Sequence, residues 1–276
     1  MARTWFITGA TRGIGAAIAK AALAAGEQVV ATARDPAKFT FEAPADRFLA
    51  LPLDVTDGAQ RSEAVRAALA RFGGIDILVN NAGYGHLGLF EETEPGDAER
   101  QFATNVFGLF EMTRAVLPVM RRQKRGHIFN LSSIAGLRAG PGGSLYCASK
   151  HAVEAFSEAL SQEVEALGLR VTLIEPGFFR TDFLDASSVR FGASRIEDYA
   201  ALSEQVRSNY AARNRQQAGD PDKLAAAMLK LADTDKPPLR FAAGSDAVEM
   251  IDAKIGRLQA ELEAWRALSV TTDGDF

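Results

Sequence analysis

TGATRGIG, residues 8–15, joins a short apolar run to an alanine-rich helical pattern. Its glycines, Gly9, Gly13 and Gly15, let the backbone turn sharply and approach a bound group closely. The free N–H groups and the positive dipole end of the following helix would then face a pyrophosphate. The spacing is G-x-x-x-G-x-G rather than the general fingerprint G-x-G-x-x-G, and close packing of strand and helix is the alternative explanation.

Short apolar runs alternate with helical patterns along the rest of the chain. The runs are apolar almost throughout, which is typical of strands buried on both faces of a parallel sheet: WFITG, EQVVATA, FLALPLDV, IDILVNNAG, HIFNLSS, RVTLIEPG and PLRFAAG. Their order predicts an α/β fold with a Rossmann-type, doubly wound parallel sheet of about seven strands flanked by helices. Ligands of such folds bind at the carboxyl ends of the strands.

We expect residues 1–276 to form one domain, because no linker or repeat divides the sequence. Its cofactor half would span about 2–133, and its catalytic and substrate half about 134–276. Two segments depart from the alternation of strands and helices. Residues 182–220 predict a polar helical insertion, and residues 246–268 predict a charged amphipathic C-terminal helix.

The composition excludes several classes of function. The formal net charge of −4 is spread along the chain, without the basic stripe that nucleic acid requires. The single cysteine excludes an internal disulfide, and three widely separated histidines offer no metal cluster. No apolar run approaches the ~20 residues that span a bilayer, and the amino-terminal stretch lacks a signal pattern. We therefore expect a cytoplasmic protein without metal, nucleic-acid or membrane partners.

A second polar constellation follows the fifth strand. Ser132 and Ser133 leave that strand, and SLYCASK, residues 144–150, places Tyr146 and Lys150 one helical turn apart on the same face. A nearby cation favours the phenolate and lowers the tyrosine pKa towards the range of a general acid/base. Serines after a strand are also common turn formers, and a surface Tyr/Lys pair at this spacing often arises by chance.

Together these motifs resemble the short-chain dehydrogenase/reductase (SDR) family in its single-domain branch. The resemblance runs from residue 2 to about 181 and rests on TGATRGIG, NNAG (80–83), Asn105 in TNVFG, Ser133, Tyr146-x-x-x-Lys150 and PGFFRT (176–181). It implies a Rossmann fold and an oxidoreductase that transfers a hydride between a nicotinamide cofactor and a ketone, aldehyde or secondary alcohol. The motifs look most like those of the family's carbonyl reductases.

The resemblance also implies a role for each catalytic residue. Tyr146 would be the general acid or base, while Lys150 would lower the Tyr146 pKa and hold the nicotinamide ribose. Ser133 would hydrogen-bond the substrate oxygen, and Asn105 would hold a water that connects Lys150 to solvent. The segment 182–220 would be the substrate lid. The expected substrate contacts, for which core packing is an equal explanation of the phenylalanines, are Ser133, Leu137, Tyr146, Phe178, Phe179 and Phe183.

The family pattern implies a long set of cofactor contacts. They are Gly9, Thr11, Arg12, Gly13, Ile14, Gly15, Arg34, Asp54, Val55, Asn81, Ala82, Gly83, Tyr146, Lys150, Pro176, Gly177 and Thr181. A carboxylate at the end of the second strand would select NAD. This sequence has Ala33 at that position, followed by Arg34, which with Arg12 in the glycine loop suits the extra phosphate of NADP. A slip of one residue would make Asp35 the selector. NADP(H) is therefore the expected cofactor, and NAD(H) remains compatible with the sequence.

Three alternatives stay open on the sequence alone. They are an NAD-dependent alcohol dehydrogenase of the same family, a non-catalytic dinucleotide-sensing protein, and a sugar-nucleotide epimerase or dehydratase on the same fold. A non-catalytic dinucleotide-sensing protein would be expected to have lost the catalytic residues, and all of them are present in this sequence. A homodimer or homotetramer is expected by resemblance, through helices within 98–122 and 144–167. The C-terminal helix at 246–268 could block or replace that contact.

Overall fold

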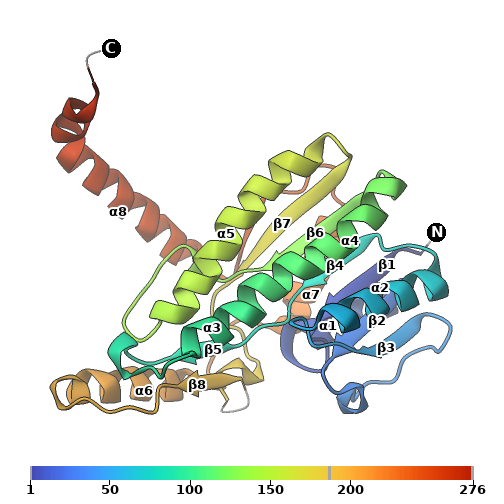
Figure 1. The fold of residues 1–276 in the computed structure, drawn as a ribbon, viewed down its shortest axis with the longest axis horizontal. Coiled ribbons are helices and arrows are strands. Elements are labelled where there is room, and N and C mark those ends of the chain that lie inside the picture. The colour runs from blue at the N-terminus through green and yellow to red at the C-terminus, as the bar shows by residue number, and fades with distance from the viewer. Residues whose placement is uncertain (1, 186–187, 275–276) are drawn as a thin grey trace.

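The computed structural model describes residues 2–185 and 188–274. Its main sheet has seven strands, paired in parallel in the order β3-β2-β1-β4-β6-β7-β9 (Figure 1). These are the seven predicted strands: β1 (Thr4–Thr8), β2 (Gln28–Ala33), β3 (Phe48–Pro52), β4 (Ile77–Asn80), β6 (Gly126–Leu131), β7 (Leu169–Pro176) and β9 (Arg240–Ala243). The predicted Rossmann-type sheet is confirmed.

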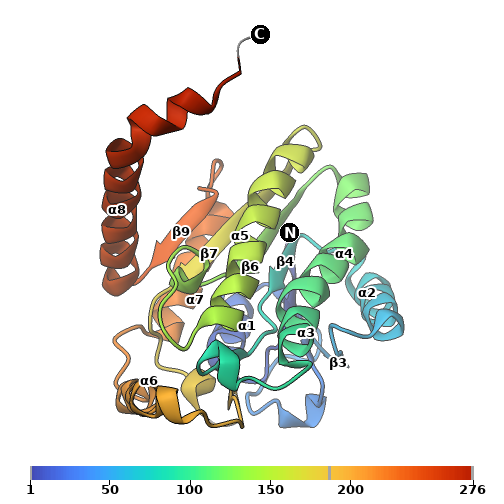
Figure 2. The same cartoon turned by 60° about the vertical axis from the view of Figure 1, so that its left-hand side comes forward.

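Helices cover both faces of the sheet (Figures 1 and 2). One face carries α1 (Gly13–Ala24) and α7 (Pro221–Asp233), and the other carries α2 (Gly58–Phe72), α4 (Leu109–Gln123) and α5 (Ser144–Glu165). Side chains alternate along β1, so that Trp5 and Ile7 join the first layer and Phe6 joins the second. This burial on both faces explains why the strand sequences are apolar throughout.

Short elements complete the frame. A helix α3 (Asp97–Phe102) continues through a π-helical segment, Ala103–Gly108, directly into α4. Isolated 3₁₀ turns occupy Pro36–Lys38, Phe90–Glu92, Ile134–Gly136, Asp182–Leu184, Glu197–Tyr199 and Val270–Thr272. Among the helices that the structure describes, none is both long and apolar enough to cross a membrane.

The insertion at 182–220 is only partly helical, which corrects the prediction. Its helix is α6 (Ala200–Arg213), but it also contains β8 (Val189–Phe191), which pairs in parallel with β5 (Gly85–Leu87) in a second, two-stranded sheet. Three-residue strands held by a distant partner leave no periodic pattern to detect. Ala186 and Ser187, which fall within the expected lid, lie outside the described residues.

The predicted C-terminal helix is present as α8 (Ser245–Ser269). It begins beside β9 and leaves the body of the molecule, as Figures 1 and 2 show. From Ile255 onward every residue that the structure describes is exposed. The helix therefore adds little to the core, whose buried residues come from the sheet and the helices that cover it.

Candidate active site

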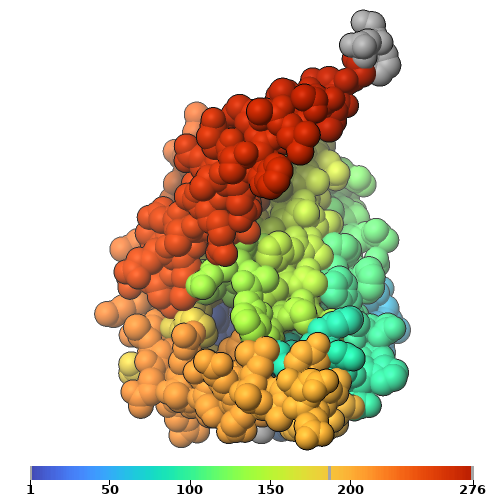
Figure 3. All heavy atoms as spheres, turned by 90° about the vertical axis from the view of Figure 1, so that its left-hand side faces the viewer, coloured from blue at the N-terminus to red at the C-terminus, as the bar shows by residue number. Residues whose placement is uncertain are grey.

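A cavity of about 1080 Å³ opens at the carboxyl ends of the parallel strands. Figure 3 shows a hollow between α5 and α6, with atoms of the N-terminal part of the chain visible at its bottom. The turn after β1, the ends of β4, β6 and β7, and the start of α5 all contribute to the lining. The cavity thus lies where this fold class binds its ligands.

The glycine turn forms one end of the cavity. Gly9 and Gly13 line it with positive φ angles of 66° and 56°, and α1 begins at Gly13 with its first N–H groups lacking helical acceptors. A Cβ atom on Gly15 would lie 2.5 Å from Asn81 Nδ2 and 2.6 Å from the Gly9 carbonyl oxygen, so this glycine serves close packing instead. Asn81 Nδ2 fixes the turn by donating to the Thr8 and Gly9 carbonyls at 2.8 and 2.9 Å.

Most of the predicted cofactor contacts share this end and the adjoining wall. Those that line the cavity are Gly9, Thr11, Arg12, Gly13, Ile14, Arg34, Asp54, Val55, Asn81, Ala82, Gly83, Tyr146, Lys150, Pro176, Gly177 and Thr181. Gly15 is the predicted cofactor contact that lies outside the lining. Asp54 Oδ1 accepts hydrogen bonds from the N–H and hydroxyl of Thr56, which orders the loop after β3.

The end of the second strand presents an arginine to the cavity. β2 ends at Ala33, and both Ala33 and Arg34 line the cavity. Asp35 does not, because its carboxylate caps the 3₁₀ turn that follows, accepting from Ala37 N at 3.2 Å, and lies 3.7 Å from Lys38 Nζ. Arg34 is therefore the charged side chain that the end of β2 presents to the cavity.

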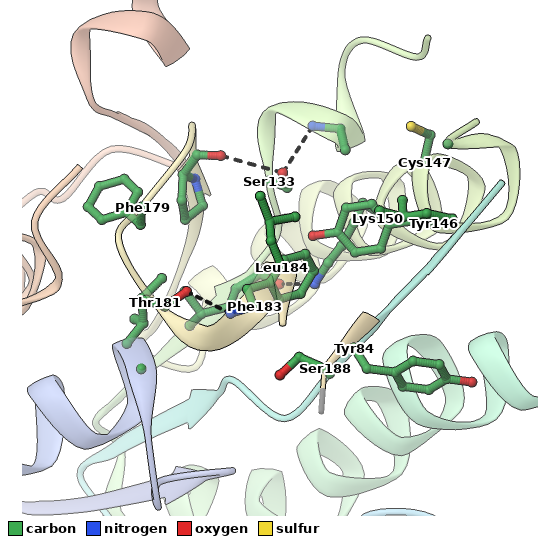
Figure 4. A pocket seen from close by; sticks show the side chains of 18 of the residues that line it. Tyr84, Ser133, Tyr146, Cys147, Lys150, Phe179, Thr181, Phe183, Leu184 and Ser188 are labelled. Atoms are coloured by element: carbon green, nitrogen blue, oxygen red, sulfur yellow. Dashed lines mark hydrogen bonds between the residues drawn. The ribbon is translucent and has the colours of Figure 1, made fainter. Parts of the chain in front are cut away.

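Ser133, Tyr146 and Lys150 meet in the same cavity (Figure 4). Ser133 follows β6, and its Oγ accepts from Ala135 N at 3.1 Å and donates to the Pro176 carbonyl at 3.4 Å. Tyr146 and Lys150 come from the first turns of α5, and the Lys150 ammonium lies 5.9 Å from the centre of the Tyr146 ring. The Lys150 Nζ donates to the Leu131 carbonyl at 2.6 Å, which holds it against the end of β6.

Burial dominates the titration of this pair. It raises the pKa of the Tyr146 phenol above its ordinary value, and a hydrogen bond with Ser133 offsets only part of the rise. It lowers the pKa of Lys150 to about 8, against the opposing charge of Glu154. In this structure the Lys150 ammonium is turned to a backbone carbonyl, and burial dominates the pKa of the Tyr146 phenol. The expected lowering of the Tyr146 pKa by Lys150 stays a prediction.

Asn105 lies behind the cavity rather than on its wall. It belongs to the π-helical segment between α3 and α4, and only 1% of it is exposed. Its side chain accepts from Tyr84 N at 3.1 Å and donates to the Tyr84 carbonyl at 2.9 Å and Ser149 Oγ at 3.3 Å. A single π turn is frequent at functional sites, and here it turns Asn105 towards α5 and the loop after β4. Its expected role in holding a water stays a prediction.

Three phenylalanines contribute to the wall of the cavity. The Phe183 ring lies 5.5 Å from the Tyr146 ring, and Phe178 and Phe179 also line the space. Phe179 packs in addition on the core between the sheet and α1, so both explanations proposed from the sequence apply to it. Leu137 lies outside the lining, and the structure therefore gives it no place on the substrate wall.

The sequence reasoning expected a substrate lid at 182–220 but named none of the α6 residues that line the cavity. One face of α6 lines the cavity with Leu202, Gln205, Val206, Asn209, Tyr210 and Arg213. These positions recur every three or four residues, a signal that was present in the sequence. This face was not recognised because it mixes polar and apolar residues, whereas a helix that packs on a core has a uniformly apolar face. Tyr84, Cys147 and Leu184 were missed as well.

A buried acidic pair lies next to Lys150. Glu154, one turn further along α5, and Glu175 of β7 are both almost fully buried, and the Arg240 Nε lies 3.3 Å from Glu154 Oε2 and 3.6 Å from Glu175 Oε1. Burial raises the pKa of Glu154 and of Glu175, and the neighbouring charge of Glu154 raises that of Glu175 further. The two carboxyl groups therefore retain a proton where an exposed glutamate would have lost it.

Comparison with known proteins gives the family. A family model for short chain dehydrogenases matches residues 3–189. Oxidoreductase BOA17 of Botryotinia fuckeliana is 39% identical over 275 residues, which cover 99% of this chain and 100% of that protein. The chain belongs to the short-chain dehydrogenase/reductase family. A crystal structure of an SDR-family dehydrogenase from Streptomyces avermitilis matches with a TM-score of 0.92 and 40% identity, over 99% of this chain and 100% of that one.

Solved structures of other SDR proteins hold either nicotinamide dinucleotide. One from Burkholderia phymatum, in complex with NAD, matches with a TM-score of 0.80 and 27% identity over 96% of this chain and 95% of its own. A metagenomic SDR oxidoreductase in complex with NADP matches with a TM-score of 0.67 and 27% identity over 87% of this chain and 95% of its own. This SDR protein is an oxidoreductase of a family whose members bind NAD or NADP.

Proposed function

We propose that this SDR protein is an NADP(H)-dependent carbonyl reductase that also runs in reverse as a secondary-alcohol dehydrogenase. The observation that carries the proposal is the meeting of Ser133, Tyr146 and Lys150 in the same cavity as the glycine turn. A dinucleotide that lies across this cavity would have its pyrophosphate at the start of α1 and its nicotinamide near Tyr146.

The residues of the cavity fit a dinucleotide. The close approach of Gly9 to Ala82, where a Cβ would lie 3.0 Å from the Ala82 Cα, keeps side-chain atoms out of the turn. The α1 N-terminus offers N–H donors to a pyrophosphate, and Lys150 would hold the nicotinamide ribose. When bound, the nicotinamide supplies or accepts the hydride, and the protein supplies orientation and the proton.

Proton transfer would rest with Tyr146. Because burial raises its pKa, the phenol is neutral at physiological pH and carries the proton that a reduced carbonyl oxygen requires. Ser133 would hold the same oxygen, which fixes the carbonyl between the two hydroxyl groups. This state of Tyr146 favours the reductive direction, since alcohol oxidation needs the phenolate.

Cofactor preference would follow from Arg34. Its guanidinium lines the cavity just past the end of β2, and Asp35 is held away from the cavity as the cap of the next turn. A guanidinium binds a phosphate by charge and by paired hydrogen bonds. These features support NADP(H) over NAD(H). The alternative, an NAD-dependent alcohol dehydrogenase, would be favoured by a carboxylate at the end of β2, where this chain has Ala33 followed by Arg34.

The proposal predicts NADPH-dependent turnover of a carbonyl substrate. A panel of aldehydes and ketones would be screened by loss of NADPH absorbance. It should include keto acids because exposed arginines, among them Arg138, Arg190 and Arg213, border the cavity. Tyr146→Phe should lower kcat by about 10²–10⁴ and keep NADPH affinity, since only the proton donor is removed.

Tyr210→Phe is the matched control, because it removes another phenol from the same cavity. It should leave kcat within about tenfold of the wild type, a smaller effect than the loss of a general acid produces. Near-normal turnover by Tyr146→Phe would contradict the assignment. Tight NADPH binding without turnover of any carbonyl would favour the non-catalytic dinucleotide-sensing alternative.

A further inference from the structure

The outer part of α8 has no protein surface to pack on. Residues 255–269 are all exposed, although they include Leu258 at 50%, Leu262 at 56% and Trp265 at 63% exposure. Figures 1 and 2 show this stretch extending away from the sheet and its helices. A helix of roughly 15 residues is marginal in water by itself. The stretch therefore requires a partner to remain helical and to cover its apolar side chains.

Six apolar residues of α8 follow a heptad spacing, from which Met250 and Leu268 depart. Val248, Ile251, Ile255, Leu258, Leu262 and Trp265 are separated by three and four residues in alternation, so they form the a and d positions of a coiled-coil seam. The remaining faces carry mainly charged residues and alanines. A spacing of 3.5 residues favours packing against another helix over packing on the flat face of a sheet.

Charge argues for a protein partner rather than a membrane. Residues 245–269 carry five acidic and three basic side chains, a net charge of −2. Helices that lie on membranes are rich in lysine and arginine, since biological surfaces carry anionic lipids. The negative helix would be repelled from such a surface.

We propose that α8 pairs with α8 of a second copy of this chain in an antiparallel coiled coil, which makes the protein a homodimer. In this register Ile255 packs on the partner's Leu258, Ile251 on the partner's Leu262, and Val248 on the partner's Trp265. The same contacts recur by the two-fold symmetry, so six apolar layers form from one seam. Every seam residue named above then has an apolar partner.

The charges that flank the seam are complementary in this register. Lys254 and Glu261 both occupy g positions, and an antiparallel pair brings g positions of the two helices together. Lys254 therefore meets the partner's Glu261, and Glu261 meets the partner's Lys254. Arg266 is already engaged by Glu263 of its own helix at 2.9 Å.

The attachment of α8 to the body favours the antiparallel direction. The bodies begin at the amino-terminal end of each helix, where Ala247 is buried. A parallel pair would bring two bodies to the same end of helices only ~8–10 Å apart, which is less than the width of a domain. An antiparallel pair places the bodies at opposite ends of a pair of helices, each roughly 37 Å long.

Sedimentation equilibrium of the full chain tests the proposal. The wild type should be a dimer at micromolar concentration, and Leu262→Glu should weaken dimerisation by at least about 100-fold, because it buries a carboxylate in the seam. Ala260→Glu is the matched control, since it adds the same charge to the outer face of the same helix. It should leave the dimer intact.

A charge exchange tests the register. Lys254→Glu alone should weaken the dimer by about tenfold, because it faces the partner's Glu261. The double variant Lys254→Glu/Glu261→Lys should restore the affinity, since each pair is complementary again. In a parallel pair the lysine introduced at position 261 would face the partner's Arg266, and the double variant would stay weak.

Tryptophan emission gives an independent readout. The chain has two tryptophans, and Trp5 is fully buried, so changes in emission on dilution report on Trp265. Dilution of the wild type should shift the emission to the red as Trp265 leaves the seam. A monomeric wild type, or a dimer that Leu262→Glu leaves unchanged, would overturn the proposal, and so would failure of the double variant to recover.

Discussion

Arg34 is the residue on which the proposed preference for NADP(H) depends. Its guanidinium lines the cavity, and among the described residues no ion pair joins it to an acidic side chain. Arg34→Ala should lower the affinity for NADPH by about 10–100-fold, the effect of losing a charged hydrogen-bond partner. Affinity for NADH should change by less than about twofold, since NADH lacks the phosphate.

Lys38→Ala provides a matched loss of charge at the next turn, where the ammonium is exposed and outside the cavity lining. It should leave both affinities unchanged. Titration calorimetry of the variants with both cofactors makes the comparison. Equal losses for NADPH and NADH in Arg34→Ala would remove this residue from the phosphate site.

Single residues also show which features of the site could not be predicted from the sequence. The motif spacing singled out Ser133, Tyr146 and Lys150, and the structure brings them together in one cavity. It left Arg34 and Asp35 as rival selectors because the end of a strand cannot be fixed to one residue from its pattern. The burial of the Tyr146 phenol and the turning of the Lys150 ammonium to a backbone carbonyl could not be predicted from the sequence, because both are tertiary properties.

At the scale of elements, the acidic pair connects α5, β7 and β9. Glu154, Glu175 and Arg240 come from these three elements, and Glu158 on the exposed side of α5 binds the same arginine at 2.6 Å. Arg240 thereby holds the last strand of the sheet against the helix that carries Tyr146 and Lys150. No sequence pattern indicates this contact, since the three elements are far apart along the chain.

Stability should fall with pH because of this pair. The pKa of Glu175 is raised in the folded protein, so its stabilising contribution is complete below the ordinary glutamate pKa and is lost as pH rises through the raised value. The Glu175→Gln variant has no carboxyl group at this position, so its stability lacks this contribution from titration. The Tm of the wild type should therefore drop relative to that of the variant between pH 6 and 9, by about 2–4 °C per kcal/mol lost.

Calorimetric unfolding at about pH 6, 7.5 and 9 measures this difference in Tm, because these values lie below and above the raised pKa of Glu175. Lys150, Tyr146 and Arg240 are common to both proteins, so the difference isolates Glu175. Parallel Tm curves for wild type and variant would show that Glu175 carries no raised pKa.

Elements differed in how well their sequences predicted them. The seven strands of the main sheet were found because burial on both faces leaves continuous apolar runs. β5 and β8 were missed because each has three residues and is defined by a partner in a distant part of the chain. The helix α6 was expected within 182–220, but its cavity-facing side was not, because that side mixes leucine, tyrosine and arginine.

At the scale of the whole molecule, the site is assembled from nearly the entire chain. The glycine turn lies near the amino terminus, Tyr146 and Lys150 lie on α5, and the α6 wall follows β8. Parallel strands with right-handed crossovers bring these segments to one edge of the sheet, which is why the order of motifs predicted the site. The long exposed α8 takes no part in that edge beyond Met250 and is free to make the contact between copies proposed above.

Titration calorimetry of the unmodified protein with NADPH and with NADH, in the absence of substrate, tests the central claim most directly. It requires no knowledge of the physiological carbonyl compound. The account predicts that NADPH binds at least about tenfold more tightly than NADH, because Arg34 adds a charged contact to the phosphate. Equal or tighter binding of NADH would contradict the role of Arg34, and binding of neither would contradict the dinucleotide site itself.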